Sequence, residues 1–232
     1  MTQSVFYKQA PITEALLDLR VANAHLLSIP QFRQELSSLA NDYPTQKEIL
    51  DFTRQTPLGL LMASADGKQV FQARQDGMTF SRLAPYGRWQ IFRDEARRLW
   101  TLYRELTNPQ QLLRVTVRYI NRLDLPSAFV DLKEYLRTSP EISPALTQEL
   151  SGYFMQLQLP QHDLKALLVL NQATVPSPSP EQASLLLDIE LSRDIDLVND
   201  EVFLWDYLEQ LRLRKNQIFN GCLTEKMKEL IQ

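Results

Sequence analysis

The sequence predicts an α+β fold in which internally duplicated β-α-β-β-β-α units form one antiparallel sheet of about eight strands, with two long helices on one face. Two observations support this prediction. Segments in which apolar and polar residues alternate come in the same order in both halves of the chain, and each half closes on a long segment with helical apolar spacing. The halves span residues 1–109 and 110–232. We expect both to lie in one continuous domain.

The composition is that of a globular chain with one sizeable core. Hydrophobic side chains make up 44% of the 232 residues, and the formal net charge is -3 at pH 7. No overall positive field exists to hold a polyanion, so nucleic acid is not an expected partner. The single cysteine, Cys222, excludes a disulfide framework and favours a reducing, cytoplasmic location. The apolar runs are strand-sized and the amino terminus lacks a signal-peptide pattern, so no contact with a membrane is expected.

The first predicted strand lies in EALLDLRV at residues 14–21, where apolar and polar side chains alternate. This alternation puts Asp18 and Arg20 on the polar side. A short helix follows, because apolar residues from Ile29 to Leu39 recur at helical spacing after a serine that can cap the first turn.

Three further strands and a long helix complete the first half. The strands between Leu58 and Phe80 are separated by the turn dipeptides Asp66-Gly67 and Asp76-Gly77, which predicts a three-stranded meander. From Arg88 to Leu106 the apolar residues follow a helical period, and most arginines lie off that stripe. This segment is predicted to be an amphipathic helix that ends near Asn108-Pro109.

The second half repeats the order. The alternating strand LLRVTVRYINRLDLP at residues 112–126 precedes a helix expected to open at Ser127 and to include Phe129, and the strands GYFMQLQL, LKALLVLN and SLLLDIELS come next. A second long helix is expected to begin near Asn199, a favourable cap with Asp200 and Glu201 in the first turn, and to run to Asn220-Gly221, where glycine can supply the left-handed closing residue. The segment LTEKMKELI adds a last helical turn or two.

The two units are expected to join edge to edge, because each alone leaves an open strand edge and an exposed apolar face. The resulting arrangement is similar to the saddle of the TATA-binding protein. If the sheet curls further around its helix, it is similar to a helix-grip fold instead. Either likeness concerns the fold and carries no function.

Three segments together resemble a sporadically distributed prokaryotic family of uncharacterised proteins. They are APITEALLDLR at residues 10–20, VRYINRLDLP at 117–126 and LRLRKNQIF at 211–219. The resemblance extends over nearly the full length, and Thr13 departs from it where the family often has a branched apolar residue. It implies the fold more than an activity, and no cofactor. The patchy distribution of the family fits transferred genes, such as defence or toxin-antitoxin neighbourhoods.

The best candidate site is a mixed field of arginines and carboxylates on the polar side of the sheet. Its members are Arg114, Arg118 and Arg122 in the mid-chain strand, Asp18 and Arg20 in the first strand, and Asp188 and Glu190 in SLLLDIELS. The same alternation directs Leu113 and Tyr119 inward. Converging guanidinium groups could hold an anionic ligand or the acidic side chains of a partner. The alternative is cross-strand salt bridging on a solvated face.

The second long helix supplies a polar pair, Lys215 and Asn216, as candidates for a structural role. Lys215 falls on the apolar stripe, so a cation points inward. Either it reaches along its stem to solvent, or it pairs with a carboxylate of the sheet such as Asp188 or Asp18. Asn216 is expected to hydrogen-bond the end of a strand. Cys222 lies on the same stripe and is predicted to be an inert, packed thiol.

Catalytic motifs are nearly absent. His25 and His162 are the only histidines, and no phosphate-binding loop or nucleophile elbow occurs among the six glycines. We therefore predict no catalytic residue, cofactor or metal. The sequence favours a non-catalytic protein-binding or regulatory protein that binds a protein partner or a second copy of itself. The alternative is a sensor that holds a small anionic ligand between sheet and helices through Arg118 or Arg122.

Overall fold

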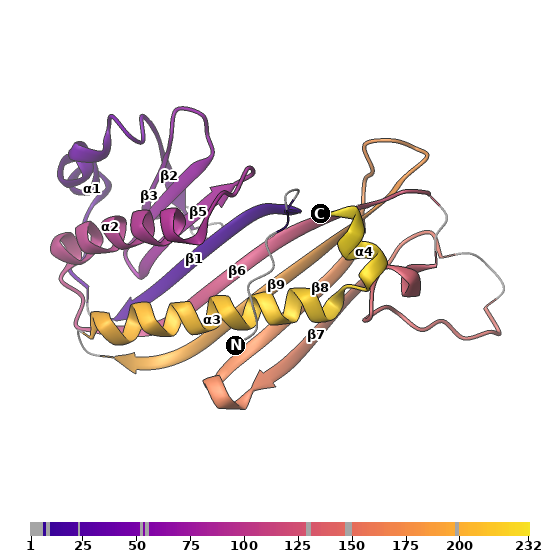
Figure 1. The fold of residues 1–232 in the computed structure, drawn as a ribbon. Helices are drawn as coiled ribbons and strands as arrows, with labels where there is room; N and C mark the ends of the chain where they lie inside the picture. The colour runs from indigo at the N-terminus through magenta and orange to yellow at the C-terminus, as the bar shows by residue number, and fades with distance from the viewer. Residues whose placement is uncertain are drawn as a thin grey trace. The chain divides into compact units, whose positions relative to one another are not determined.

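The computed structural model describes residues 7, 10–22, 24–51, 53, 56–128, 131–146, 150–197 and 200–232. Over these residues nine strands form one open antiparallel sheet in the order β2-β3-β4-β5-β1-β6-β9-β8-β7 (Figure 1). The predicted α+β class and the antiparallel sheet are confirmed, and the sheet has more strands than expected. None of the helices in this part of the chain is both long enough and apolar enough to span a bilayer.

The chain divides into two compact units, each named here by strands that it contains. The β1–β5 unit comprises Thr13–Arg118 and Ser192–Leu208, and the β7–β8 unit comprises Met1–Ile12, Tyr119–Leu191 and Glu209–Gln232. Three strands, β1, β6 and β9, and the long helix α3 therefore contribute residues to both units, β1 by its first residue alone. The predicted boundary between the two halves of the chain, at residues 109 and 110, belongs to the proposed duplication. It stays a prediction.

The β1–β5 unit follows the predicted order of strand, short helix, meander and long helix. Its elements are β1 (Ile12–Ala22), α1 (Ile29–Glu35), η1 (Leu36–Leu39), β2 (Thr45–Leu50), β3 (Pro57–Ala63), β4 (Gln69–Arg74), β5 (Gly77–Leu83) and α2 (Trp89–Thr107). Strand β2 was not predicted. Its residues are all exposed or half-buried, so they carry no apolar alternation that could reveal a strand.

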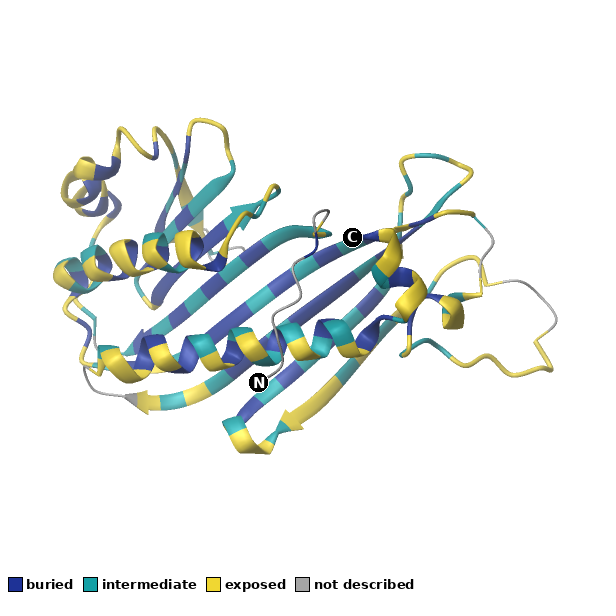
Figure 2. Ribbon diagram, viewed as in Figure 1, coloured by how far each residue is buried: buried dark blue, intermediate teal, exposed yellow. Residues whose placement is uncertain are grey.

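The core of this unit lies between α2 and one side of the strands. Along β1, buried residues alternate with half-buried ones, as predicted (Figure 2). Phe80 of β5 stacks on Phe92 of α2 with ring centroids 5.2 Å apart, and the hydroxyl of Tyr103 donates to the carbonyl oxygen of Arg74 at 2.9 Å. The apolar stripe of α2 is therefore core, and the polar side of β1, opposite its buried residues, carries Asp18 and Arg20.

The remaining elements belong wholly or partly to the β7–β8 unit. They are β6 (Gln111–Leu125), η2 (Leu132–Glu134), β7 (Phe154–Gln161), η3 (His162–Leu164), β8 (Ala166–Val175), β9 (Ala183–Leu197), α3 (Glu201–Cys222) and α4 (Glu225–Leu230). Instead of the helix expected to open at Ser127, the described residues contain only the short 3-10 helix η2. Phe129 lies outside the described residues, so that part of the prediction stays untested.

Helix α3 differs from the prediction at its C-terminal end. The expected cap, Asn199, lies outside the described residues, and the helix is recorded from Glu201. The helix continues through Gly221 to Cys222, so the left-handed closing conformation expected at the glycine was wrong. The last turn of the helix is unbroken, and the phenyl ring of Phe219 and the thiol of Cys222 are both buried there.

The alternation predicted for the mid-chain strand is confirmed from Val117 to Leu125 in β6, whereas Thr116 on the polar side is buried. It fails at the start of the strand, where Leu113 is 41% exposed and Leu112 takes the buried position. Arg114, Arg118 and Arg122 are half-buried, and Arg118 and Arg122 each lie between core residues. The polar side of β6 therefore carries the three arginines, as the period of two requires.

Candidate functional site

An ion-pair network centred on Asp18 occupies the polar side of β1. The carboxylate of Asp18 accepts from Thr79 Oγ1 at 2.5 Å and from Arg74 Nη2 at 2.7 Å, both on Oδ1, and from Arg20 Nε at 2.9 Å on Oδ2. Arg20 and Arg74 each also pair with Asp76. The structure thus brings together the predicted residues Asp18 and Arg20. It adds the side chains of Thr79, Arg74 and Asp76, which were not among the predicted site residues.

The network runs from a buried base to an exposed rim. The side chains of Arg74 and Asp18 are 9% and 15% exposed, whereas those of Arg20 and Asp76 are 40% and 60% exposed. Partial burial lowers the pKa of Arg20, but the charges of Asp18 and Asp76 outweigh it and raise that pKa above its ordinary value. Arg20 is therefore a fixed positive charge that faces solvent.

The strand register explains why these side chains meet. Asp18 lies directly opposite Thr79, and Gly77 lies opposite Arg20 on one neighbour and Arg74 on the other. Gly77 has φ +146°, and a Cβ atom there would lie 2.0 Å from the Leu19 carbonyl oxygen, so only glycine fits at this turn. The Asp76-Gly77 turn was predicted. It places the carboxylate of Asp76 where both Arg20 and Arg74 can pair with it.

Arg114 is held by two residues of β9. Its Nη2 donates to Ser192 Oγ at 2.8 Å, and its Nη1 lies 3.4 Å from Asp194 Oδ1. The Arg114 side chain is still 42% exposed. Arg118 lies four residues further along β6, on the same polar side, and is half-buried. Neither Ser192 nor Asp194 was among the predicted site residues.

Arg122 is held in the same way in the β7–β8 unit. Its Nε donates to Asp124 Oδ1 at 2.9 Å, and its Nη2 donates to Ser184 Oγ at 3.0 Å and to the carbonyl oxygen of Pro176 at 2.8 Å. Ser184 Oγ in turn donates to Asp124 at 2.5 Å. The Arg122 side chain is 35% exposed. One edge of this guanidinium group is therefore occupied, and part of it faces solvent.

The carboxylates predicted in β9 differ from each other in burial. Asp188 is 2% exposed and accepts from Asn171 Nδ2 at 2.9 Å, while Asn171 Oδ1 accepts from Gln156 Nε2 at 2.8 Å. This row of amides across β7 and β8 was not predicted. Glu190 is half-buried. Among the described residues, no cluster of three or more histidine, cysteine or carboxylate side chains is placed to hold a metal.

Lys215 is buried on the inner side of α3, at 7% exposure, as its place on the apolar stripe predicted. Its ammonium lies 3.9 Å from the centroid of the Tyr119 ring, and within the described part of the chain no carboxylate pairs with it. Burial, and to a smaller extent the charge of Arg212, lower the pKa of Lys215 to about 7. The structure therefore replaces both expectations, solvent and carboxylate, with an aromatic ring.

The other two candidates of the same helix are less informative. Asn216 is half-buried, and its side chain has no hydrogen-bond partner among the described residues, so the bond expected to a strand end is not seen there. Cys222 is buried, and burial raises the pKa of its thiol to about 11. The predicted packing of Cys222 is confirmed, and its thiolate is disfavoured at neutral pH.

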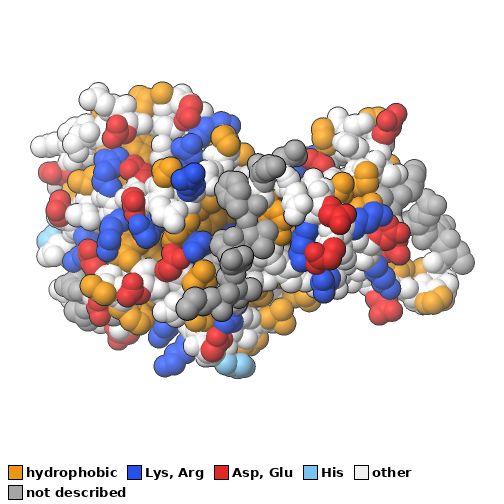
Figure 3. Space-filling view, in the orientation of Figure 1, with side chains coloured by type: hydrophobic (Ala, Val, Ile, Leu, Met, Phe, Trp, Pro, Cys, Tyr) orange, Lys and Arg blue, Asp and Glu red, His pale blue; other side chains and the backbone are white. Residues whose placement is uncertain are grey.

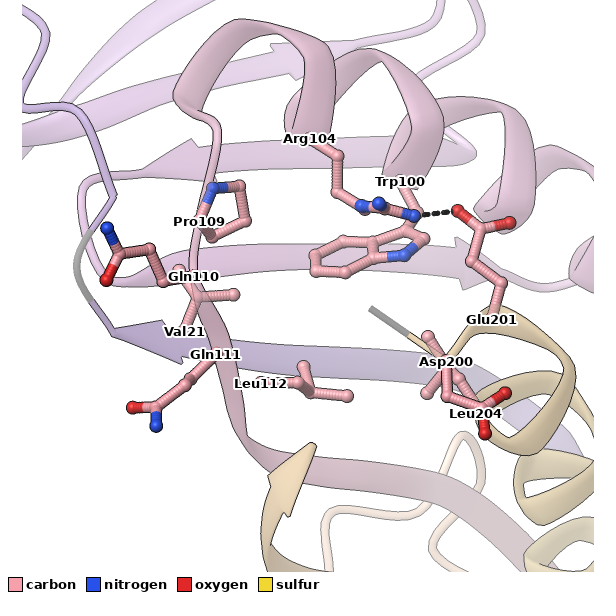
Figure 4. A pocket seen from close by; sticks show the side chains of 10 residues that line it. All are labelled: Val21, Trp100, Arg104, Pro109, Gln110, Gln111, Leu112, Asp200, Glu201 and Leu204. Carbon is pink, nitrogen blue, oxygen red and sulfur yellow. Dashed lines mark hydrogen bonds and ion pairs between the residues drawn. The ribbon is translucent and has the colours of Figure 1, made fainter. Parts of the chain in front are cut away.

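A cavity of about 20 Å³ lies in the β1–β5 unit (Figure 4). Its walls come from α2, the start of β6 and the start of α3, and include Trp100, Arg104 and Glu201. None of the predicted site residues lines it. On the face drawn in Figure 3, basic and acidic side chains of the described residues are interspersed.

Comparison with known proteins adds no relatives. No protein-family model matches the chain. No curated protein matches it. The resemblance drawn from the three sequence segments therefore stays a prediction.

Proposed function

We propose that this chain is a non-catalytic protein-binding or regulatory protein that contacts its partner through the arginines on the polar sides of β1 and β6. The observation that carries the proposal is a shared geometry. Arg20, Arg114 and Arg122 each have a guanidinium group held by neighbouring side chains, with 40%, 42% and 35% of the side chain exposed. A guanidinium group that is oriented before binding loses less conformational entropy when the partner arrives.

A protein partner explains the charge pattern better than a small anionic ligand. Each of these three exposed arginines has at least one carboxylate beside it. The carboxylates are Asp18 and Asp76 for Arg20, Asp194 for Arg114 and Asp124 for Arg122. A free anion would be repelled by these carboxylates, whereas a protein surface can place opposite charges against both signs. The alternative of an anion sensor is further weakened because the described cavity contains neither Arg118 nor Arg122.

A second copy of the chain is one partner that fits. β7 is the last strand in the sheet order, and its sequence FMQLQLPQ has no charged residue. Phe154 and Leu159 on this strand are 70% and 44% exposed. An uncharged edge strand offers unpaired backbone groups to another strand without electrostatic repulsion.

We also propose that residues 1–109 and 110–232 are duplicated units in a saddle like that of the TATA-binding protein. The strand orders β1-β5-β4-β3 and β6-β9-β8-β7 support this, because each half places its last strand beside its first. Membership of the sporadically distributed prokaryotic family, and with it a defence or toxin-antitoxin context in the cytoplasm, rests on the three sequence segments.

The test is affinity capture from the native host with quantitative mass spectrometry. The variant Arg20→Ser/Arg114→Ser/Arg122→Ser removes the three oriented arginines. We expect it to lose a specific partner by at least about tenfold, the effect of one interface hot spot. Light scattering on the purified chain distinguishes a second copy from a different protein.

The matched control is Arg33→Ser/Arg88→Ser/Arg93→Ser, which removes three other arginines with the same change in net charge. Arg33 and Arg93 are 48% and 33% exposed, and both are in or beside helices. This variant should keep the partner. Equal capture by both folded variants, checked by circular dichroism, would contradict the proposal.

A further inference from the structure

The outer edge of β7 exposes a row of backbone groups. β7 is the last strand in the sheet order, and within the described part of the chain no strand lies beyond it (Figure 1). Its N–H and C=O groups alternate between the side of β8 and the open side. The amide of Thr174 donates to the carbonyl oxygen of Tyr153 at 3.1 Å, and this pair continues the register of the two strands. Phe154, Gln156 and Gln158 therefore direct both of their backbone groups to the open side.

The open side of β7 is suited to another strand, and the opposite edge of the sheet is not. Pro160, which has no N–H group, falls on the open side in the same alternation, so it removes no hydrogen bond to β8. At the opposite edge, β2 carries Lys47 and Glu48, and such charges oppose the approach of a further strand. β7 carries no charge. Of the two edge strands, β7 is therefore the one that can accept a further strand.

The side chains of β7 are symmetric about Leu157. Met155 and Leu159 lie on the same side of the strand as Leu157, one before it and one after it. Gln156 and Gln158 flank it on the other side. By chemical type the sequence MQLQL thus reads the same in both directions. Such a segment is complementary to a reversed copy of itself, as the shared patch of a two-fold dimer must be.

We propose that two copies of the chain pair antiparallel through β7, with the two-fold axis at Leu157. Gln156 then lies opposite Gln158 of the second copy, and Met155 lies opposite Leu159 of the second copy. About six backbone hydrogen bonds join the two strands. The apolar row is incompletely covered in one copy, since Met155 and Leu157 are half-buried and Leu159 is 44% exposed. Pairing continues this row into that of the second copy.

The same register gives the exposed ring of Phe154 an apolar neighbour. Phe154 is 70% exposed and lies opposite Pro160 of the second copy. The inference deepens the proposed function and rests on it in one respect, because it names a second copy as a partner. It uses none of the arginines on β1 and β6, so either surface can fail without the other.

The first test compares charge variants of two residues by sedimentation velocity of the full chain. We expect the wild type to dimerise with a dissociation constant of about 1–100 μM, as small interfaces do. Gln156→Lys/Gln158→Lys places lysine opposite lysine at both pairs, so the dissociation constant should rise about five- to thirtyfold. Gln156→Lys/Gln158→Glu places lysine opposite glutamate and should stay within about threefold of the wild type.

Two results of this comparison would overturn the proposal. One is a wild type that stays monomeric at about 500 μM, well above the expected dissociation constant. The other is equal dissociation of the two charge variants, because only the register about Leu157 brings residue 156 of one copy opposite residue 158 of the other. Circular dichroism checks that both variants are folded.

A cysteine at the axis tests the register directly. Under mild oxidation Leu157→Cys should form a covalent dimer, because its two copies are a non-hydrogen-bonded pair with Cα atoms about 4.5 Å apart, within the range of a disulfide. Gln156→Cys is the control, since its two copies lie about 8–9 Å apart, too far to bridge. The native Cys222 is buried and should not cross-link. No covalent dimer at position 157, with or without one at position 156, would contradict the proposed axis.

The variant Arg20→Ser/Arg114→Ser/Arg122→Ser separates this inference from the proposed arginine surface. It leaves β7 unchanged, so it should dimerise as the wild type does even where it loses another protein. Loss of the dimer in this variant, with the dimer retained in Gln156→Lys/Gln158→Lys, would assign the self-contact to the arginines and refute pairing through β7.

Discussion

Two cations are buried to a similar depth in the two units, in opposite chemical environments. The Arg74 side chain in the β1–β5 unit is 9% exposed and pairs with Asp18 and Asp76. Lys215 in the β7–β8 unit is 7% exposed and has the ring of Tyr119 at 3.9 Å as its neighbour. Similar burial is thus compatible with a charge that is neutralised by carboxylates and with a charge that is partly lost near neutral pH, because the pKa of Lys215 is lowered to about 7.

The chemistry of the two side chains explains the difference. A guanidinium group carries five N–H donors and does not lose its proton, so burial requires acceptors around it. A lysine can release its proton instead, and burial lowers the pKa of Lys215 to about 7. We infer that the Arg74 network depends on its carboxylate, and that Lys215 makes the stability of the fold depend on pH.

The largest effect is expected from Asp18→Ala. This change leaves the buried Arg74 with the exposed Asp76 as its carboxylate and with the neutral acceptors Thr79 and Gln72, so the free energy of unfolding should fall by about 3 kcal/mol. Urea denaturation measures it. Asp76→Ala is the control, because its side chain is 60% exposed and should cost under about 1 kcal/mol. Equal losses would show that the buried base of the network is no more important than its rim.

Lys215→Met should remove a pH dependence. The pKa of Lys215 is about 7 in the folded chain against 10.5 ordinarily, so the unfolded chain binds more protons between these values. Stability therefore rises as pH increases from about 7, and the rise by pH 9.5 is roughly 2–3 kcal/mol. Urea denaturation at both pH values should show this rise in the wild type and in Lys47→Met, an exposed control. Equal rises in Lys215→Met and wild type would contradict it.

The smallest effect on stability is expected from Arg20→Ser. Arg20 is part of the same network as Arg74, but its side chain is 40% exposed, so its ion pairs contribute under about 1 kcal/mol. Thermal or urea denaturation checks this. A loss as large as that of Asp18→Ala would mean that Arg20 is structural and would remove it from the proposed binding surface.

Much of the fold could be predicted because the period of two is strong in the central strands. β1 and most of β6 sort their residues as expected, from Ala15 to Val21 and from Val117 to Leu125. β2 escaped prediction because an edge strand with no buried residue has no apolar pattern. The helix expected after Ser127 was predicted from four residues with apolar rings or chains, which are Phe129, Leu132, Tyr135 and Leu136. They are too few to outweigh the prolines that follow at 140 and 144.

The site was predicted only in part, because its partners come from register and not from local sequence. Arg74 and Asp18 are 56 residues apart, and nothing in either segment reveals that β4, β5 and β1 align them. The contact between Lys215 and Tyr119 was easier to predict, because both residues were expected to point inward. The prediction offered Lys215 only solvent or a carboxylate, although an aromatic ring such as that of Tyr119 can also hold a cation.

The most direct test of the account measures how firmly the exposed arginines are oriented. NMR relaxation of arginine Nε–H groups should give order parameters above about 0.6 for Arg20 and Arg122 and well below that for Arg88. Arg88 is exposed, and its side chain has no partner among the residues described. If Arg20 and Arg122 prove as mobile as Arg88, they are not oriented before binding, and the proposed binding surface loses its basis.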